Sequence, residues 1–270
     1  VWKPINKVGV YVPGGTASYP SSVIMNIIPA IVAGVRDLVL CSPTPKGKYN
    51  PLVLYAANKL GVQNILRIGG AQAIAALALG TDAVKKVDKI TGPGNAFVSE
   101  AKRQLVGEVG IDSLAGPSEV VIICDNSLRP ELAAIDLLSQ AEHDERAQSI
   151  LITTDHEYAR AVEKEIFRFL QKLKRKDIAG KSWKNFGAIV IVNSFTEGVE
   201  LSNKIAPEHL QLCFKGAEKE KNNIQNAGSV FVGEWSPEAL GDYISGSNHI
   251  LPTNGAARFS SSLSVFDFVK

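Results

Sequence analysis

The chain has 270 residues, of which 45% are hydrophobic and 21% charged, as is ordinary for a globular protein of one or two domains with a sizeable core. Its formal net charge of +2 is too small to indicate a nucleic-acid partner. No uninterrupted apolar run is long enough to cross a membrane and no signal peptide begins the sequence, so a cytoplasmic protein without a membrane partner is expected.

The first half of the chain alternates strand-like and helical patterns. Strands are predicted at residues 8–12, 37–41, 65–68 and 89–91. Each is followed by a helical pattern, and these patterns end near residues 34, 60, 79 and 106. Alternation at this spacing is typical of βαβ units, so a mainly parallel sheet is expected.

The same alternation resumes in the second half. Strands are predicted at residues 119–124, 149–153, 188–192 and 229–232. The total of about eight strands divides near Gly116-Pro117-Ser118 into halves of about four. The predicted fold class is therefore α/β, with two Rossmann-like parallel-sheet domains at residues 1–117 and 118–270. No sequence repeat relates the two halves.

Glycines follow three of the predicted strands in the first half, at Gly14-Gly15, Gly69-Gly70 and Gly92-Pro93-Gly94. Ligands of open parallel sheets bind beyond the carboxyl ends of the strands, where helix N-termini offer backbone N–H groups to phosphate. These turns would let a dinucleotide approach, and three side chains are placed for ring and ribose contacts: Tyr11, Gln72 and Asn95. The sequence has no G-x-G-x-x-G fingerprint, however, and such turns need glycine for backbone geometry even where nothing binds.

Gln140 and His143 lie three residues apart at the end of a helical pattern, so both are expected on one helix face. An imidazole nitrogen suits zinc, and an amide oxygen can serve as a further neutral ligand. Two ligands do not complete a zinc site, so the others would come from elsewhere in the chain or from a partner. The alternative is that His143 is a solvated residue at a helix end.

Ala206-Pro207-Glu208-His209 places a carboxylate beside an imidazole after a proline. Both side chains suit proton transfer near neutral pH. Because adjacent residues face different ways, we expect Glu208 and His209 to flank a substrate rather than to pair with each other. Taken alone, the pair is not specific for catalysis.

A third polar stretch runs from Asp242 to His249, with small residues between them. This carboxylate and this histidine are candidates for a metal or substrate site, unless Asp242 only caps a turn and His249 only fills the loop. His156 lies between two acidic residues at the start of a charged helical pattern and is expected to face solvent.

Together these stretches resemble the histidinol dehydrogenase family over essentially the whole chain. Six blocks in the family's order carry the resemblance: Tyr11-Val12-Pro13-Gly14-Gly15 with Tyr19-Pro20-Ser21-Ser22, Gly92-Pro93-Gly94-Asn95, Ala115-Gly116-Pro117-Ser118-Glu119, Gln140-Ala141-Glu142-His143, Ala206-Pro207-Glu208-His209, and Gly241-Asp242-Tyr243 through Asn248-His249. The resemblance implies a zinc-dependent enzyme that oxidises L-histidinol through L-histidinal to L-histidine with two NAD⁺, at the end of histidine biosynthesis. It also implies a homodimer of intertwined chains and an aldehyde-dehydrogenase-like arrangement of domains.

The resemblance further implies roles for single residues. The zinc ligands would be Gln140, His143 and Asp242. The same three residues would bind the substrate, together with Ser118 and His209. In this family zinc holds the amino and imidazole nitrogens of the substrate, so the metal serves mainly to orient the substrate.

The catalytic pair implied by the resemblance is Glu208 and His209. His209 would take the alcohol proton, and Glu208 would activate the water that adds to the aldehyde. The NAD⁺ site would be lined by Tyr11, Gln72 and Asn95. No cysteine would be catalytic.

The family also has an N-terminal helical segment and a C-terminal segment, which reaches into the partner subunit and supplies a last zinc-ligand histidine and a substrate-binding glutamate. Neither is present in this sequence, which is therefore expected to be an excerpt of a complete enzyme or a truncated chain. Two alternatives to the dehydrogenase stay open. One is a zinc hydrolase that activates water without a nucleotide, and the other is a non-catalytic binding module.

Overall fold

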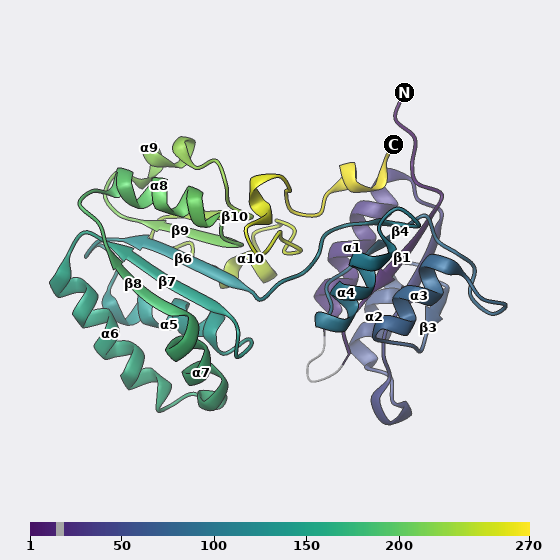
Figure 1. Cartoon of the computed structure of the whole chain (residues 1–270), viewed down its shortest axis with the longest axis horizontal. Helices are drawn as coiled ribbons and strands as arrows, with labels where there is room; N and C mark the ends of the chain where they lie inside the picture. Colours follow the sequence, from purple (N-terminus) through teal and green to yellow (C-terminus); the bar gives the residue numbers. More distant parts are fainter. Residues whose placement is uncertain (15–18) are drawn as a thin grey trace. The chain divides into compact units, whose positions relative to one another are not determined.

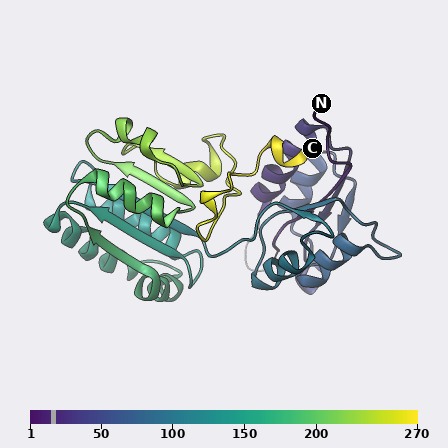
Figure 2. The same ribbon diagram turned by 45° about the horizontal axis from the view of Figure 1, so that its top comes forward.

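The computed structural model describes residues 1–14 and 19–270, which form two compact units. The first unit consists of residues up to Gly116 with segments 248–250 and 262–270, and the second consists of residues 117–247 and 251–261. Segments 248–250 and 262–270 lie in the range predicted for the second domain, but they pack with the first unit. Each unit is a sheet with helices on both faces (Figures 1 and 2).

The first unit is built on a parallel sheet with the strand order β3-β2-β1-β4-β5. Its strands are β1 (Lys7–Tyr11), β2 (Asp37–Cys41), β3 (Asn64–Leu66), β4 (Lys89–Thr91) and β5 (Gly110–Ile111). Its helices are α1 (Pro20–Ala33), α2 (Pro51–Lys59), α3 (Ala71–Leu79) and α4 (Ala96–Leu105), with short 3-10 turns η1 (Pro45–Gly47) and η4 (Val265–Phe268).

Side-chain alternation along β1 divides the core of the first unit into two layers. Val8, Val10 and Val12 point to the face covered by α1 and α2. Tyr11 points to the opposite face, which α3 and α4 cover. Local signals fix where the helices begin. For example, α2 starts at a proline, and the side chain of Asn50 accepts the backbone N–H groups of Leu52 and Val53.

The second unit is built on a parallel sheet with the strand order β10-β9-β6-β7-β8. Its strands are β6 (Glu119–Cys124), β7 (Gln148–Thr153), β8 (Gly187–Ile191), β9 (His209–Cys213) and β10 (Ser229–Val232). Its helices are α5 (Pro130–Ala141), α6 (His156–Leu170), α7 (Lys176–Phe186), α8 (Phe195–Ile205), α9 (Ala217–Glu220) and α10 (Ala239–Tyr243), with 3-10 turns η2 (Lys221–Asn223) and η3 (Ala256–Arg258). Figure 1 shows α5, α6 and α7 on one face of this sheet and α8 and α9 on the other.

The two units have the same strand order when strands are counted from the start of each unit. In both, the order is third, second, first, fourth, fifth. The order reverses between β1 and β4 in the first unit and between β6 and β9 in the second. The α/β class and the two Rossmann-like parallel sheets are therefore as predicted, and a structural repeat exists where no sequence repeat is visible.

Three features differ from the sequence-based expectations. The described residues contain five strands in each unit, whereas about four were predicted. The sequence pattern misses β5 because this strand has only two residues. It misses β9 because the buried polar Gln211 interrupts the apolar pattern of that strand. The helix α7 was not anticipated. The sequence pattern of residues 266–270 indicates a helix that continues to the last residue, and this prediction is wrong. Only the turn η4 forms, and Val269 then makes an antiparallel bridge with Pro4.

Within the part of the chain that the structure describes, no helix combines the length and apolar character needed to cross a membrane.

Leu151 of β7 is fully buried, whereas Leu52 of α2 is 56% exposed. We expect Leu151→Ala to lower the free energy of unfolding by about 2–5 kcal/mol, because it leaves a cavity against α5 and α6. The matched control Leu52→Ala should change it by less than about 0.5 kcal/mol. Urea denaturation of both variants checks this, and equal losses would contradict the assignment of Leu151 to the core.

Candidate active site

Glu119 and Glu208 face each other at the amino ends of two neighbouring strands. β6 and β9 pair in parallel with Val120 opposite His209, so the preceding residue of each strand is also brought opposite its partner. The adjacency of these strands joins positions 89 residues apart in the sequence.

Glu119 and Glu208 exchange hydrogen bonds. The backbone N–H of Glu119 donates to Oε2 of Glu208 over 2.9 Å, and the backbone N–H of Glu208 donates to Oε2 of Glu119 over 3.3 Å. The other carboxylate oxygen of Glu119 accepts the N–H of Asn254 over 3.2 Å. Each carboxyl group is thus held in position by main-chain donors.

His209 is oriented by the main chain of Glu119. Its Nδ1 lies 3.0 Å from the Glu119 carbonyl oxygen. A carbonyl oxygen only accepts, so Nδ1 donates the hydrogen and the lone pair of the neutral ring is on Nε2. His209 is 7% exposed, which leaves Nε2 as the basic atom of a largely buried ring.

Carboxylates lie on both sides of this imidazole. Oε2 of Glu208 is 3.7 Å from Nδ1, and Oε1 of Glu238 is 3.7 Å from Nε2. Both distances are too long for a direct hydrogen bond but short enough for strong attraction to a protonated ring. Glu208 and His209 therefore make no direct hydrogen bond, although their charged groups lie close together.

Burial keeps Glu208 largely protonated and Glu238 about half protonated at neutral pH. It raises the pKa of Glu208 to about 8, and the charges of Glu119, Glu238 and Asp242 add to the rise against the lowering effect of the Glu119 N–H. Burial likewise raises the pKa of Glu238 to about 7, with Asp242 adding to the rise. Carboxyl groups poised this close to neutrality are suited to proton transfer.

Glu238 and Glu119 were not among the predicted site residues. Glu238 directly precedes α10, and the Ser139 hydroxyl donates to its Oε2 over 3.2 Å. An acidic residue at the start of a helix is common, so nothing in the local sequence distinguishes Glu238. Glu119 ends the block from Ala115 to Glu119, but only the pairing of β6 with β9 brings it to Glu208 and His209.

The turn before Glu208 has an uncommon backbone conformation. Ala206 ends α8 with φ of 56° and ψ of 59°, in the left-handed region, and is fully buried. This conformation costs a non-glycine residue about 1–2 kcal/mol. The N–H of Gly228 donates to the carbonyl of the following Pro207 over 2.9 Å, which helps to hold this turn.

The predicted zinc ligands come from the end of α5 and from α10. Gln140 is buried in the last turn of α5, but the helix ends at Ala141, so His143 lies beyond it rather than on its face. The N–H of His143 bonds to the Gln140 carbonyl over 3.1 Å, which keeps the two residues in one tight turn. His143 is exposed and Asp242 is half-buried.

The donor chemistry of these three residues fits zinc. Among the described residues no three His, Cys, Asp or Glu side chains are close enough to hold a metal ion, but the predicted set contains only two residues of these types together with an amide. One hydrogen bond joins the start of α10 to the end of α5: the hydroxyl of Ser139, which precedes Gln140, donates to Glu238. Asp242 lies in the same short helix and its charge acts on Glu238. An amide oxygen, an imidazole and a carboxylate are ligand types that zinc accepts.

The predicted NAD⁺ residues follow strands of the first unit. Tyr11 ends β1, and its hydroxyl accepts the N–H of Gly70 over 3.1 Å. Burial raises the pKa of Tyr11, so its hydroxyl keeps its hydrogen at neutral pH. Asn95 follows β4 and caps α4 by accepting the N–H of Val98, while Gln72 is exposed in the first turn of α3.

Tyr11 and Asn95 thus flank the point where the strand order reverses, at the carboxyl edge of the sheet. Packing alone explains one glycine there, because a Cβ atom on Gly69 would lie 2.5 Å from Pro43. Gly15, which belongs to the first glycine turn, lies outside the described residues.

The other predicted residues lie as follows. Ser118 directly precedes Glu119, and its carbonyl accepts the N–H of Gln148 over 2.9 Å. His156 is exposed, as predicted. His249 belongs to segment 248–250 of the first unit, and its Nε2 is buried without a hydrogen-bond partner among the described residues.

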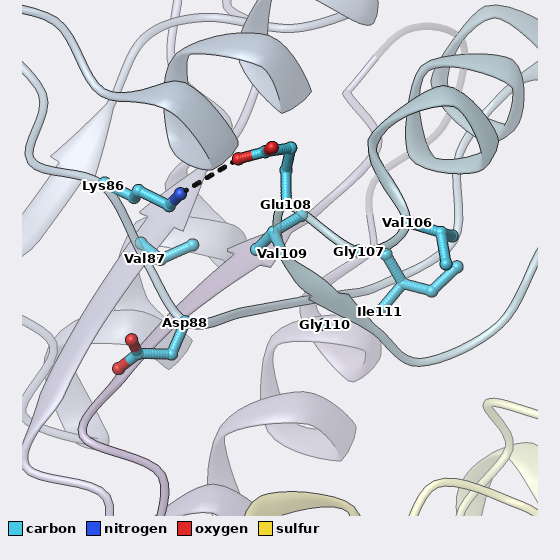
Figure 3. Close-up of a pocket in the computed structure, with 9 residues that line it drawn as sticks. All are labelled: Lys86, Val87, Asp88, Val106, Gly107, Glu108, Val109, Gly110 and Ile111. Carbon is cyan, nitrogen blue, oxygen red and sulfur yellow. Dashed lines mark hydrogen bonds and ion pairs between the residues drawn. The ribbon is translucent and has the colours of Figure 1, made fainter.

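A groove in the first unit lies away from the predicted cofactor residues (Figure 3). It is lined by residues 86–88 and 106–111, at the amino ends of β4 and β5. Tyr11 and Asn95 lie at the opposite, carboxyl edge of the sheet, so the groove is not part of the candidate site.

The three cysteines, Cys41, Cys124 and Cys213, are free and buried. Burial raises the pKa of each thiol to about 12, so none is a thiolate at neutral pH.

Comparisons with known proteins agree on one family. A family profile described as histidinol dehydrogenase matches residues 1–270. Histidinol dehydrogenase from Ruegeria pomeroyi is 57% identical over 269 residues, covering 100% of this chain and 62% of the relative. The enzyme from Geobacter metallireducens is 56% identical over 267 residues, covering 99% of this chain and 61% of the relative. The chain thus spans about 62% of the length of such relatives.

Solved structures give the same result. The crystal structure of histidinol dehydrogenase from Elizabethkingia anophelis has a TM-score of 0.96 at 44% identity and covers 100% of this chain and 63% of that one. An acetylating aldehyde dehydrogenase from Geobacillus thermoglucosidasius has a TM-score of 0.64 at 14% identity, covering 100% of this chain and 74% of that one. The second likeness shows that the fold is shared with aldehyde dehydrogenases.

The raised pKa of Glu208 has a consequence for stability. Between the ordinary carboxyl pKa of 4.5 and about 8, folded Glu208 keeps a proton that the unfolded chain releases, so rising pH lowers the free energy of unfolding. We expect Glu208→Gln to flatten this fall, whereas the exposed control Glu200→Gln should leave it unchanged. Urea denaturation at pH 5, 6.5 and 8 measures the effect, and parallel curves for wild type and Glu208→Gln would refute it.

Proposed function

Because the chain belongs to the histidinol dehydrogenase family, we propose that its enzyme oxidises L-histidinol through L-histidinal to L-histidine with two NAD⁺, in the last steps of histidine biosynthesis. The observation that carries the chemistry is the bond from Nδ1 of His209 to the Glu119 carbonyl. It commits Nε2, in a buried position, to the role of base.

His209 takes the proton of the substrate hydroxyl at Nε2 in the first oxidation. The ring becomes positively charged, and the carboxyl groups of Glu208 and Glu238, each 3.7 Å from a ring nitrogen, are placed to stabilise that charge when ionised. The Glu119 carbonyl keeps the ring orientation during this change, because Nδ1 donates to it in both protonation states.

Glu208 takes a proton from the water that adds to the aldehyde before the second oxidation. Its pKa of about 8 leaves a fraction ionised at neutral pH, and this fraction grows as pH rises through 8. The N–H of Glu119 holds the carboxylate that accepts the proton.

The remaining residues hold the substrate and the two cofactors. Zinc would be held by Gln140, His143 and Asp242, which with His209 and Ser118 also bind L-histidinol, and NAD⁺ would be held by Tyr11, Gln72 and Asn95. When bound, NAD⁺ supplies the hydride acceptor and zinc orients the amino and imidazole nitrogens of the substrate. We further propose a homodimer in which the partner chain completes the zinc site.

L-histidinol should bind in a zinc-dependent manner. We expect isothermal titration calorimetry to detect binding when Zn²⁺ is present and none after treatment with a chelator. Equal affinity in both conditions would contradict the zinc site. Reduction of NAD⁺ by bound L-histidinol separates the dehydrogenase from a zinc hydrolase, which has no use for a nucleotide.

His209→Asn should lower the rate of NAD⁺ reduction by roughly 10²–10⁴-fold, because the variant lacks the base. Zinc-dependent binding of L-histidinol should persist with reduced affinity, because the proposed metal ligands are intact but one substrate contact is lost. The control His156→Asn alters an exposed histidine at the start of α6 and should leave the rate unchanged. Steady-state kinetics measures both, and full activity of His209→Asn would show that another group is the base.

A further inference from the structure

The first unit contains a buried ion pair between α4 and the end of β5. Nζ of Lys102 lies 2.6 Å from Oδ1 of Asp112, and the side chains are only 3% and 5% exposed. Removing two charges from water is costly, and an apolar pair of the same volume would stabilise a fold as well or better. The pair therefore calls for an explanation beyond stability.

Both partners of the pair also bind Gly92. Nζ of Lys102 donates to the Gly92 carbonyl over 2.7 Å, and Oδ2 of Asp112 accepts the Gly92 N–H over 2.7 Å. The ion pair thus binds both the backbone N–H and the backbone carbonyl of Gly92, which is the first residue after β4.

Gly92 has no side chain, so only contacts to its backbone can fix its position. Its φ is 108°, and a Cβ atom would lie 1.9 Å from the carbonyl oxygen of Tyr11 on the neighbouring strand β1. Only glycine fits this close approach. A glycine is also the most flexible residue, so the position of the turn from Gly92 to Asn95 depends on contacts to its backbone.

We propose that Lys102 and Asp112 are positioning residues for cofactor binding, because they fix the Gly92–Asn95 turn beside Tyr11 where the strand order of the sheet reverses. This inference rests on the proposed NAD⁺ site. Buried as they are, the two side chains act through the turn, which presents Asn95 and the first N–H groups of α4 at the carboxyl edge of the sheet.

The double variant Lys102→Met with Asp112→Leu tests this. It removes both charges at similar volume and takes both partners from Gly92. We expect the Kd for NAD⁺ to rise roughly 10- to 100-fold, while kcat at saturating NAD⁺ changes by no more than about twofold. The affinity for L-histidinol with Zn²⁺, which depends on the second unit, should not change.

The matched control uses an exposed ion pair in the same unit. Lys86 and Glu108 lie 3.5 Å apart across the groove of Figure 3, with side chains 49% and 64% exposed. Lys86→Met with Glu108→Gln should leave the Kd for NAD⁺ unchanged. An equal rise in both double variants would overturn the inference.

Two single variants keep the test decisive if the first double variant does not fold. Asp112→Asn keeps an acceptor oxygen without the charge and should weaken NAD⁺ binding by a smaller factor, whereas Lys102→Arg keeps a charged donor and should retain most of the affinity. A folded Asp112→Asn variant with wild-type affinity for NAD⁺ would overturn the inference alone. Failure of the wild type to bind NAD⁺ would overturn the proposed function with it.

Discussion

The hydrogen bonds between Glu119 and the pair Glu208–His209 hold the candidate active site together. One residue supplies an N–H to the Glu208 carboxyl, a carbonyl to the His209 ring and a carboxylate to the Glu208 backbone. Main-chain groups of a central strand move little, so the orientation of both side chains follows from the sheet itself. The strained backbone at Ala206 is tolerated because β6, β9 and β10 fix the chain on its far side.

Burial then determines the chemistry that this arrangement can perform. Glu208 and Glu238 are removed from water near other acidic groups, so each stays protonated to a higher pH than an exposed carboxyl does. The buried histidine between them therefore lies close to two carboxyl groups that gain or lose a proton near neutral pH. A proposed cation bound near Asp242 would shift this balance toward the ionised carboxylates.

The two units share a strand order, but their candidate residues lie at opposite ends of the strands. Tyr11 ends β1 and Asn95 follows β4, at the carboxyl ends of the strands, where parallel sheets usually bind ligands. Glu119 and His209 begin β6 and β9, so the candidate catalytic residues lie at the amino edge. The end of α5, with Gln140, reaches the same edge because a helix that follows a strand runs back along the sheet.

The sequence by itself determined the α/β class, the alternation of strands and helices, and the stretches that contain Gln140, Glu208, His209 and Asp242, because periodicity and motif spacing are local properties. Only the tertiary structure decided that Glu119 lies beside Glu208, that Glu238 faces His209 and that β9 is a central strand. These facts depend on which strands pair, and strand pairing joins residues far apart in the chain. The ion pair that binds Gly92 is likewise decided by the tertiary structure, because no local sequence pattern links Lys102 to the turn that it holds.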